Sequence, residues 1–198
     1  MEIFVKPFEE LDINELYEIL RLRVDVFVVE QNCPYPEIDG RDLDAIHIYL
    51  EDTGEILAYA RLYEEDGQVH LGRVIAKTRR KGYGSLILKE AIEAAKNFYQ
   101  AKQIHIEAQT YAKNLYKKVG FVEDSELFLL DGIEHIKMLL DLNSHKDNKL
   151  ADNIFPDSQG PSKNELKKLV DKALANEEEA EPVDIAFAEL WDKINNKH

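Results

Sequence analysis

The sequence of 198 residues is poor in cysteine and has no long apolar run. Cys33 is the only cysteine, which excludes an intrachain disulfide and suits a reducing compartment. No stretch approaches the roughly 18 to 20 consecutive apolar residues that a membrane-spanning helix needs. The first residues show neither the basic segment nor the apolar segment of a signal peptide. We therefore expect a cytoplasmic protein that does not associate with membranes.

Positive charge is also scarce, because 25 Lys and Arg residues stand against 39 Asp and Glu residues and the formal net charge is −14. Such a chain repels phosphates, which argues against general nucleic-acid binding. One basic cluster is the exception, with four positive charges in five positions: Lys77, Arg79, Arg80 and Lys81. A run of charges is usually a solvated surface, but this one adjoins two glycines.

Hydrophobic periodicity predicts a series of strands and helices over the first 142 residues. We expect strands at 3–7, 46–50, 56–63, 69–76, 104–108, 121–130 and 135–140, and helices at about 12–31, 86–98 and 111–119. Tight turns are expected at Thr53-Gly54, Asp66-Gly67 and Asp131-Gly132. This order predicts an α+β fold, with a mixed sheet that has helices on its faces.

The composition changes after residue 142. Residues 143–161 are rich in Asn, Asp, Ser, Pro and Gly, which predicts a linker. Residues 162–198 show two amphipathic helical segments, separated by an acidic run at 177–181. Two such helices are too small to form a core alone. We therefore expect a domain at 1–142 and a C-terminal helical extension at 162–198, which packs on that domain or on a second subunit in a possible homodimer.

A strand, a basic loop with two glycines and a helix follow one another between residues 74 and 85. Backbone N–H groups at a helix N-terminus favour anions, glycine lets a ligand approach closely, and Lys or Arg neutralises its charge. The candidate phosphate-binding residues are Arg79, Arg80, Lys81, Gly82, Tyr83, Gly84 and Ser85. A dinucleotide-binding loop would need a third glycine where Ile87 stands, and the Gly-Lys-Ser/Thr of a P-loop is absent.

The loop and two further motifs resemble the GNAT superfamily of acetyltransferases over about residues 1–141. Arg79-x-x-Gly82-x-Gly84 resembles its cofactor motif. Leu115-Tyr116-x-x-x-Gly120-Phe121, preceded by Asn114, resembles its second motif. The run at 26–35 and Asp39-Gly40-x-Asp42 resemble the ElaA-like branch. The resemblance implies a GNAT-like fold, with a central, mostly antiparallel mixed sheet flanked by helices.

The resemblance also implies acetyl-CoA as a co-substrate. Backbone groups of Val74, Ile75 and Ala76 would then pair with pantetheine, and the amides of residues 79–85 would bind the pyrophosphate. Asn114 and Tyr116 would complete the cofactor site. Arg80 departs from the family pattern, in which many members carry glycine at this position.

Acetyl transfer from a thioester to an amine needs a base for the amine and an acid for the leaving thiolate. The resemblance implies Tyr116 as the general acid. The base stays open among four candidates: His70, Glu107, Glu30 and His47. A water relay without a dedicated base is a further alternative. Regular strand alternation would place His70, Gly72 and Val74 on one face, so that His70 could point toward the substrate.

Four acids fall within eight residues at positions 37, 39, 42 and 44. They form either a solvated loop or a surface that attracts a cationic amine. The resemblance favours Asp39 and Asp42 as substrate-binding residues. No group of His and Cys has metal-ligand spacing, so no metal is expected.

The sequence therefore predicts an N-acetyltransferase that transfers an acetyl group from acetyl-CoA to a primary amine of a small molecule or protein. Transfer would occur by direct attack in a ternary complex. The alternative is a CoA-binding regulatory protein whose helical tail binds a partner.

Overall fold

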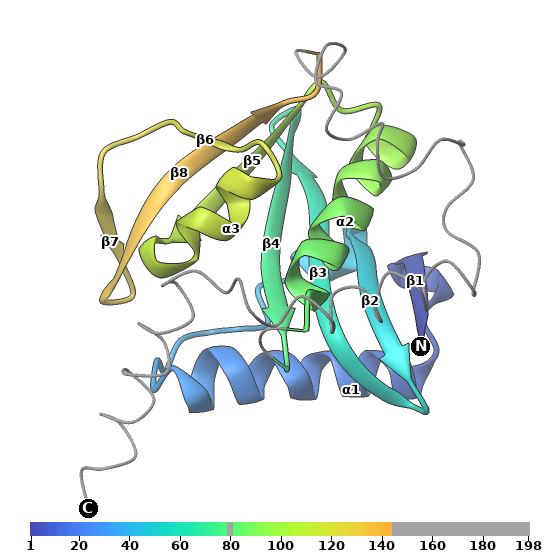
Figure 1. The fold of residues 1–198 in the computed structure, drawn as a ribbon. Helices are drawn as coiled ribbons and strands as arrows, with labels where there is room; N and C mark the ends of the chain where they lie inside the picture. Colours follow the sequence, from blue (N-terminus) through green and yellow to red (C-terminus); the bar gives the residue numbers. More distant parts are fainter. Residues whose placement is uncertain (79–80, 144–198) are drawn as a thin grey trace, which may run out of the picture.

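The computed structural model describes residues 1–78 and 81–143. The elements in chain order are β1 (Glu2–Pro7), η1 (Phe8–Glu10), α1 (Ile13–Arg23), η2 (Val24–Glu30), η3 (Arg41–Asp44), β2 (Ile46–Asp52), β3 (Glu55–Glu65), β4 (Gln68–Ala76), α2 (Tyr83–Tyr99), β5 (Gln103–Gln109), η4 (Thr110–Ala112), α3 (Lys113–Lys118), β6 (Val122–Glu123), β7 (Phe128–Leu130) and β8 (Ile133–Asp141). Figure 1 shows their arrangement.

The strands form one sheet in the order β1-β2-β3-β4-β5-β8-β6, with β7 paired to β8. Every pairing in this sheet is antiparallel except that of β4 with β5. This confirms the expected α+β fold with a mixed, mostly antiparallel sheet. Within the described residues, no helix is long and apolar enough to span a membrane.

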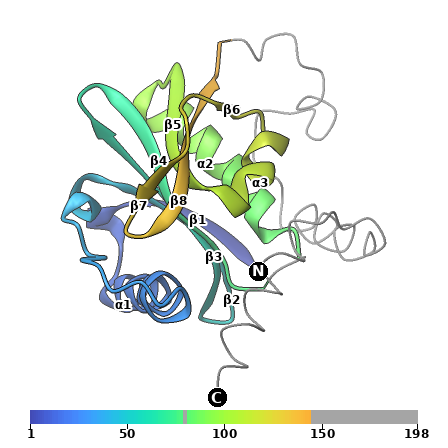
Figure 2. The same cartoon turned by 90° about the vertical axis from the view of Figure 1, so that its left-hand side faces the viewer.

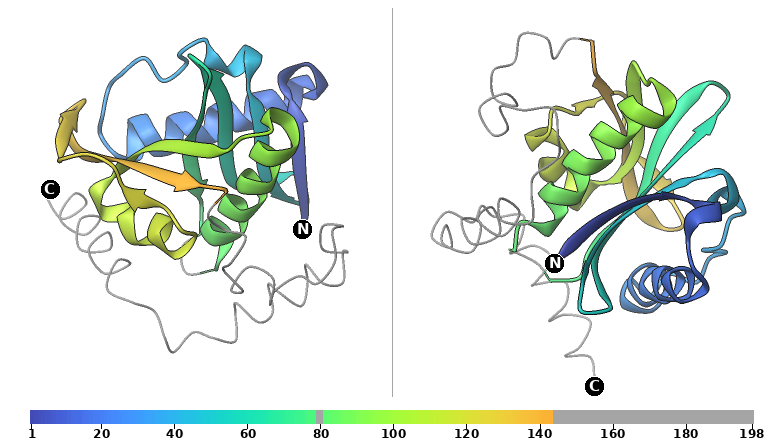
Figure 3. Two further views of the ribbon diagram at one scale, coloured as in Figure 1. Left: turned by 90° about the horizontal axis from the view of Figure 1, so that it is seen from above. Right: turned by 90° about the vertical axis from the view of Figure 1, so that its right-hand side faces the viewer.

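Helices cover both faces of the sheet (Figure 2). Helices α2 and α3 lie on one face, and α1 with η2 lies on the other, as the right-hand view of Figure 3 also shows. The main core lies between the sheet and α2, and a smaller cluster lies between the sheet and α1. Helix α2 buries a stripe with helical spacing: Ile87, Leu88, Ala91, Ala94 and Ala95. Its three alanines let the helix approach the sheet closely.

The three predicted turns are confirmed, and each has positive φ at both central residues. The φ values are 52° and 85° at Thr53-Gly54, 53° and 74° at Asp66-Gly67, and 51° and 81° at Asp131-Gly132. This is the twist that two-residue hairpins favour, because it matches the right-handed twist of the flanking strands.

Helix α1 begins at the predicted capping box. Asp12 Oδ1 accepts hydrogen bonds from the backbone N–H groups of Asn14 and Glu15, and Glu15 Oε2 accepts one from Asp12 N. The helix continues as η2, a π-helix in which Gln31 N bonds Val26 O at 3.2 Å. The expected helix to about residue 31 is therefore present, with a widened last part.

One predicted strand, at 121–130, is wrong as a continuous element. The structure has β6 and β7 instead, separated by residues 124–127. The reason lies at Ser125, whose Oγ accepts the hydrogen bond of Lys137 N at 2.9 Å. A side chain thereby replaces the backbone acceptor that a continuous strand would supply. The predicted linker and the two C-terminal helices lie outside the described residues, apart from Asn143.

Candidate functional site

The N-terminus of α2 is open to an anion. Gly82 is its N-cap residue with φ of 73°, and no side chain caps the helix. The first intrahelical bond joins Leu86 N to Gly82 O at 3.0 Å, so the amides of residues 83–85 precede it. No acidic residue lies in the first turn. The helix therefore presents its positive end at the predicted phosphate loop. Arg79 and Arg80 lie outside the described residues.

Gly84 lies where α2 meets both β4 and α3. A Cβ added there would lie 3.4 Å from Leu115 Cδ2 and 3.8 Å from Ala76 Cβ. These are ordinary contact distances, so the glycine marks close packing in which an added methyl group would just fit. The close packing places α3, and with it Tyr116, beside the predicted phosphate loop.

The sheet ladder between β4 and β5 stops early. Only Val69 with Ile104 and His70 with His105 are paired, and the two strands then diverge (Figure 1). Residues 71–76 of β4 therefore have no strand partner on their β5-facing side; we call this side the open edge. An unpaired strand edge offers backbone N–H and C=O groups to an extended ligand. Val74, Ile75 and Ala76, the predicted pantetheine contacts, belong to it.

A β-bulge in β4 accompanies the divergence. Arg61 pairs with Gly72 and Tyr59 with Ile75, so β4 has one more residue than β3 over this stretch. Arg73 in the bulge has a left-handed backbone with φ of 55°. The extra residue reverses the alternation of the side chains along the strand.

The expectation that His70, Gly72 and Val74 share one face is therefore wrong. Before the bulge, Val69 and Leu71 belong to the main core, which leaves His70 on the face of α1. After it, Val74 packs against that core. The bulge has moved Val74 to the face opposite His70.

Tyr116 lies on α3 and is buried in the main core. Its ring meets Phe121 edge to face, with centroids 5.9 Å apart. Burial, with a smaller effect of Tyr111, raises the pKa of the Tyr116 phenol well above its usual range. Its hydroxyl has no hydrogen-bond partner among the described residues. A protonated phenol without a hydrogen-bond partner can serve as a proton donor. Asn114, two residues earlier, is exposed.

His70 lies at the last paired position before the strands diverge. Its ring stacks on Tyr63 at 5.2 Å and lies 5.6 Å from the His105 ring. Burial, and then the positive charge of His105, lowers its pKa. In the described part of the chain, its ring nitrogens have no hydrogen-bond partner. The imidazole is therefore neutral near pH 7 and able to take a proton.

The other three candidate bases differ in availability. His47 is fully buried, with Nδ1 2.8 Å from the Tyr59 hydroxyl and Nε2 3.0 Å from Asp42 O, so neither nitrogen is available. Glu107 is exposed and lies 3.7 Å from Lys137 Nζ. Glu30 is half-buried at the end of η2.

The acidic segment (residues 33–44) carries carboxylates that enter a buried ionic network. Its members are Arg23, Glu37, Asp39, Asp42, Arg61 and Arg73. Arg23 Nη1 donates to Asp42 Oδ1 at 2.5 Å, and Arg61 Nη2 donates to Asp39 Oδ2 at 2.6 Å. Burial acts to raise the pKa of Asp42, but the hydrogen bonds and charges of Arg23 and Arg61 outweigh it and lower the pKa.

Asp39 and Asp42, the predicted substrate-binding residues, thus bind arginines of their own chain. The three arginines balance the three carboxylates, and Arg41 adds a positive charge 3.8 Å from Asp39 Oδ2, so the network exerts little net attraction on a cationic amine. Substrate binding by these two residues stays a prediction.

Sequence reasoning missed the arginines of this network. The signal was present for Arg61, because a charge stands in an apolar strand between Ala60 and Leu62. A buried charge requires a partner, and the acid-rich loop offers one. For Arg23 and Arg73 no comparable local signal exists.

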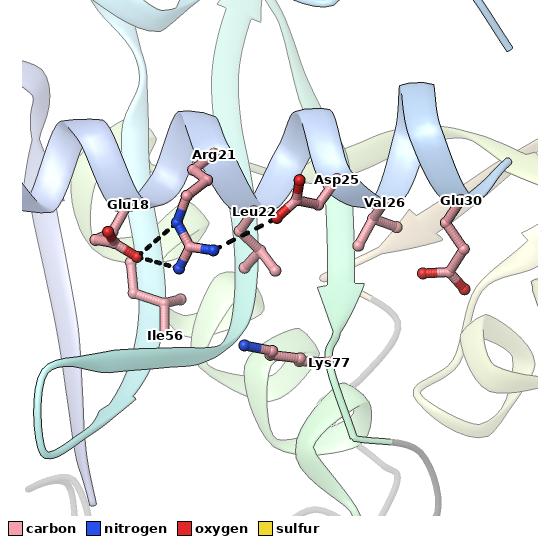
Figure 4. Close-up of a pocket in the computed structure, with 8 residues that line it drawn as sticks. All are labelled: Glu18, Arg21, Leu22, Asp25, Val26, Glu30, Ile56 and Lys77. Carbon is pink, nitrogen blue, oxygen red and sulfur yellow. Dashed lines mark hydrogen bonds and ion pairs between the residues drawn. The ribbon is translucent and has the colours of Figure 1, made fainter. Parts of the chain in front are cut away.

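A pocket lies between α1 with η2 on one side and the start of β3 and the end of β4 on the other (Figure 4). Leu22, Val26 and Ile56 give it an apolar wall, and its charged residues are Glu18, Arg21, Asp25, Glu30 and Lys77. Arg21 bonds Glu18 and Asp25 across its rim. Lys77 directly follows β4, so the pocket adjoins the start of the predicted phosphate loop but contains neither Tyr116 nor His70. Within residues 1–78 and 81–143, no cluster of three or more metal-ligating side chains is present.

Comparison with known proteins gives consistent matches over these residues. The sequence profile of the acetyltransferase (GNAT) domain matches residues 23–142. A UPF0039 protein of Schizosaccharomyces pombe is 44% identical over 147 residues, which cover 72% of this chain and 98% of that protein. The crystal structure of Escherichia coli ElaA matches with a TM-score of 0.68 and 36% identity, over 71% of this chain and 100% of its own. An acyl-CoA N-acyltransferase from Pseudomonas aeruginosa matches with a TM-score of 0.67 and 37% identity, over 71% and 99%.

Proposed function

Because the chain belongs to the GNAT family of acetyltransferases, we propose that it transfers an acetyl group from acetyl-CoA to a primary amine of a small molecule or protein. The resemblance found in its motifs, including that to ElaA, is confirmed by this membership. The observation that carries the proposal is the placement of the open edge of β4 beside the uncapped N-terminus of α2.

That placement fits the two chemically different parts of CoA. Pantetheine carries two amide groups, which can pair with the backbone of Val74, Ile75 and Ala76 as an added strand would. The pyrophosphate then reaches the amides of residues 83–85, with Lys81 nearby. The similar Pseudomonas protein is described as an acyl-CoA N-acyltransferase, which supports a CoA thioester as the donor.

The reaction needs no covalent enzyme intermediate. The amine nitrogen attacks the thioester carbonyl carbon, a tetrahedral intermediate forms, and the carbon–sulfur bond breaks. The proton lost by the amine goes to a base of the enzyme or to water. The departing thiolate takes the proton of the Tyr116 hydroxyl, which burial keeps protonated at neutral pH.

His70 is the base that the geometry supports best among the four candidates. It is neutral near pH 7, and its ring nitrogens are not used by other described residues. It also lies at the point where the open edge begins. His47 lacks a free nitrogen, and Glu107 is exposed and paired with Lys137.

The pH profile tests this role through the neighbour of His70. A base must be unprotonated, so kcat/KM should fall as the pH drops through the pKa of His70, which lies below the usual value of about 6.5. His105→Asn removes a titratable ring whose electrostatic effect lowers this pKa. The acid limb of kcat/KM should therefore move to higher pH in the variant.

His135→Asn is the matched control, because His135 is also on the sheet but bonds Ile133 O and lies on β8. Its acid limb should coincide with that of the wild-type protein. An acid limb that stays in place in His105→Asn would argue against His70 as the titrating base.

The function itself is tested by thiol release. The full chain, given acetyl-CoA and a panel of amino acids, polyamines and lysine peptides, should release free CoA only with an accepted amine. Mass spectrometry should find one acetylated amine for each thiol released. If the chain binds CoA but no amine gives turnover, the alternative of a CoA-binding regulatory protein is favoured. If the chain does not bind CoA, both the acetyltransferase and the regulatory hypothesis fail.

A further inference from the structure

Arg73 has an unusual backbone for its place in the fold. Among the described residues, it is the only non-glycine residue inside a strand with a positive φ. The others lie in hairpin turns or just after helices: Asn32, Thr53, Asp66, Gln100 and Asp131. A left-handed backbone is unfavourable for a residue with a Cβ, so contacts of the side chain must offset its cost.

Those contacts all come from residues 27–39, which begin within η2 and end just before η3. Arg73 Nε donates to Glu37 Oε1 at 2.5 Å, and Nη2 donates to Glu37 O at 3.1 Å and Asp39 Oδ2 at 3.3 Å. The guanidinium also lies 5.8 Å from the ring centre of Phe27 and 5.6 Å from that of Tyr35. The bulge is thus fixed by its side chain to residues 27–39.

Glu37 is itself rigidly placed. Arg23 donates to it from Nε and Nη2, both at 2.9 Å, and the side chains of Arg23 and Glu37 are 0% and 3% exposed. Arg73 is therefore connected through one buried carboxylate to α1. No other residue of the open edge belongs to the network.

We propose that the Arg73–Glu37 contact sets the course of the open edge and couples it to the acidic segment, which makes Arg73 a positioning residue for acyl-CoA. The inference rests on the proposed function, because it takes the ligand to lie along the open edge. The bulge directly precedes Val74, so its conformation determines where the backbone of residues 74–76 runs. A ligand paired with these residues restrains the bulge. Through the Arg73–Glu37 contact it also restrains the acidic segment.

Arg73→Gly separates the side-chain contact from the backbone conformation. Glycine adopts positive φ readily, so the bulge persists while its link to Glu37 is lost. The dissociation constant of CoA should rise about tenfold, within the range usual for coupled sites. Glu37→Gln, which weakens the same contact from the other side, should act in the same direction. In steady-state kinetics the KM for acetyl-CoA should rise more than kcat falls.

Arg41→Gln is the matched control. Arg41 lies in the acidic segment, but its guanidinium is exposed, bonds Glu65 on β3 and reaches the network only at 3.8 Å from Asp39 Oδ2. Its loss should leave the affinity for CoA unchanged. Hydrogen exchange provides a second readout, because CoA should slow exchange of residues 33–44 in the wild-type protein and in Arg41→Gln, but not in Arg73→Gly.

The outcomes are distinct. If Arg73→Gly binds CoA like the wild-type protein and keeps the protection of residues 33–44, the contact does not position the edge. If Arg73→Gly is normal and Arg73→Ala is impaired, the backbone conformation alone matters, which also overturns the proposal. If the wild-type protein binds CoA without protecting residues 33–44, the inference fails and the proposed function stands. If it does not bind CoA, both fail.

Discussion

Replacing Tyr116 by phenylalanine should lower kcat by about 10²- to 10⁴-fold, the range typical for loss of a general acid. The substitution removes only the hydroxyl, which bonds no described residue, and keeps the ring against Phe121. The melting temperature and the affinity for CoA should therefore stay close to those of the wild-type protein. Thiol release at saturating acetyl-CoA and amine measures kcat directly.

Tyr99→Phe is the control for this experiment. Tyr99 is the last residue of α2, at the opposite end of the helix from Gly82, and its hydroxyl donates to Leu62 O on β3 at 3.3 Å. Its kcat should match that of the wild-type protein even if its stability falls slightly. A Tyr116→Phe variant with wild-type kcat would show that the thiolate leaves without help from this residue.

Replacing Arg23 by methionine should lower the free energy of unfolding by about 3–5 kcal/mol, the usual effect of removing one partner from a buried ion pair. Arg23 is 0% exposed and donates to the carboxylates of Glu37 and Asp42. Arg61 and Arg73 still contact these acids in the variant but cannot satisfy them fully. Urea denaturation followed by circular dichroism measures the change.

Arg21→Met provides the same substitution two residues earlier in α1. Arg21 bonds Glu18 and Asp25 at the exposed side of the helix, so its loss should leave the denaturation midpoint unchanged.

The dependence of stability on pH provides a second check. The pKa of Asp42 is lowered in the folded protein, so its contribution is present above the unfolded value of about 3.9 and lost as the pH falls through the folded value.

The stability difference between wild-type protein and Arg23→Met should therefore shrink below about pH 4. A constant difference down to lower pH would mean that the carboxylates do not cause it. Equal stability of the two proteins at neutral pH would show that packing of the methionine offsets the loss of the ionic contacts.

Local signals explain which parts of the fold the sequence predicts. The hairpins follow from Asp-Gly and Thr-Gly pairs, and α1 follows from a capping box that acts within four residues. The break in β6–β7 was missed because it depends on Ser125 meeting Lys137, twelve residues away. The β4 bulge was missed, although Val74-Ile75 after Val69 and Leu71 already departs from strict alternation.

The candidate site also combines features that depend on neighbouring residues with features that depend on residues far apart in the sequence. The predicted phosphate loop depends on a strand, glycines and a helix start in one run, so these elements could be predicted, while phosphate binding itself stays a prediction. The use of His47 nitrogens by Tyr59 and Asp42, and of Asp39 by Arg61, depends on residues that meet only in the folded chain. Residue spacing contains no information on such pairs.

The short ladder between β4 and β5 has a consequence for the whole sheet. Strands β1 to β4 and strands β5 to β8 form two antiparallel halves, and only two residue pairs join their backbones. A pantetheine chain paired along the open edge would fill the gap and make the sheet nearly continuous. The donor would then be a structural part of the fold during each turnover. A donor concentration of about 100 times its dissociation constant would add about 2.7 kcal/mol to the stability of the domain. Release of the product would leave residues 71–76 of β4 without a partner again.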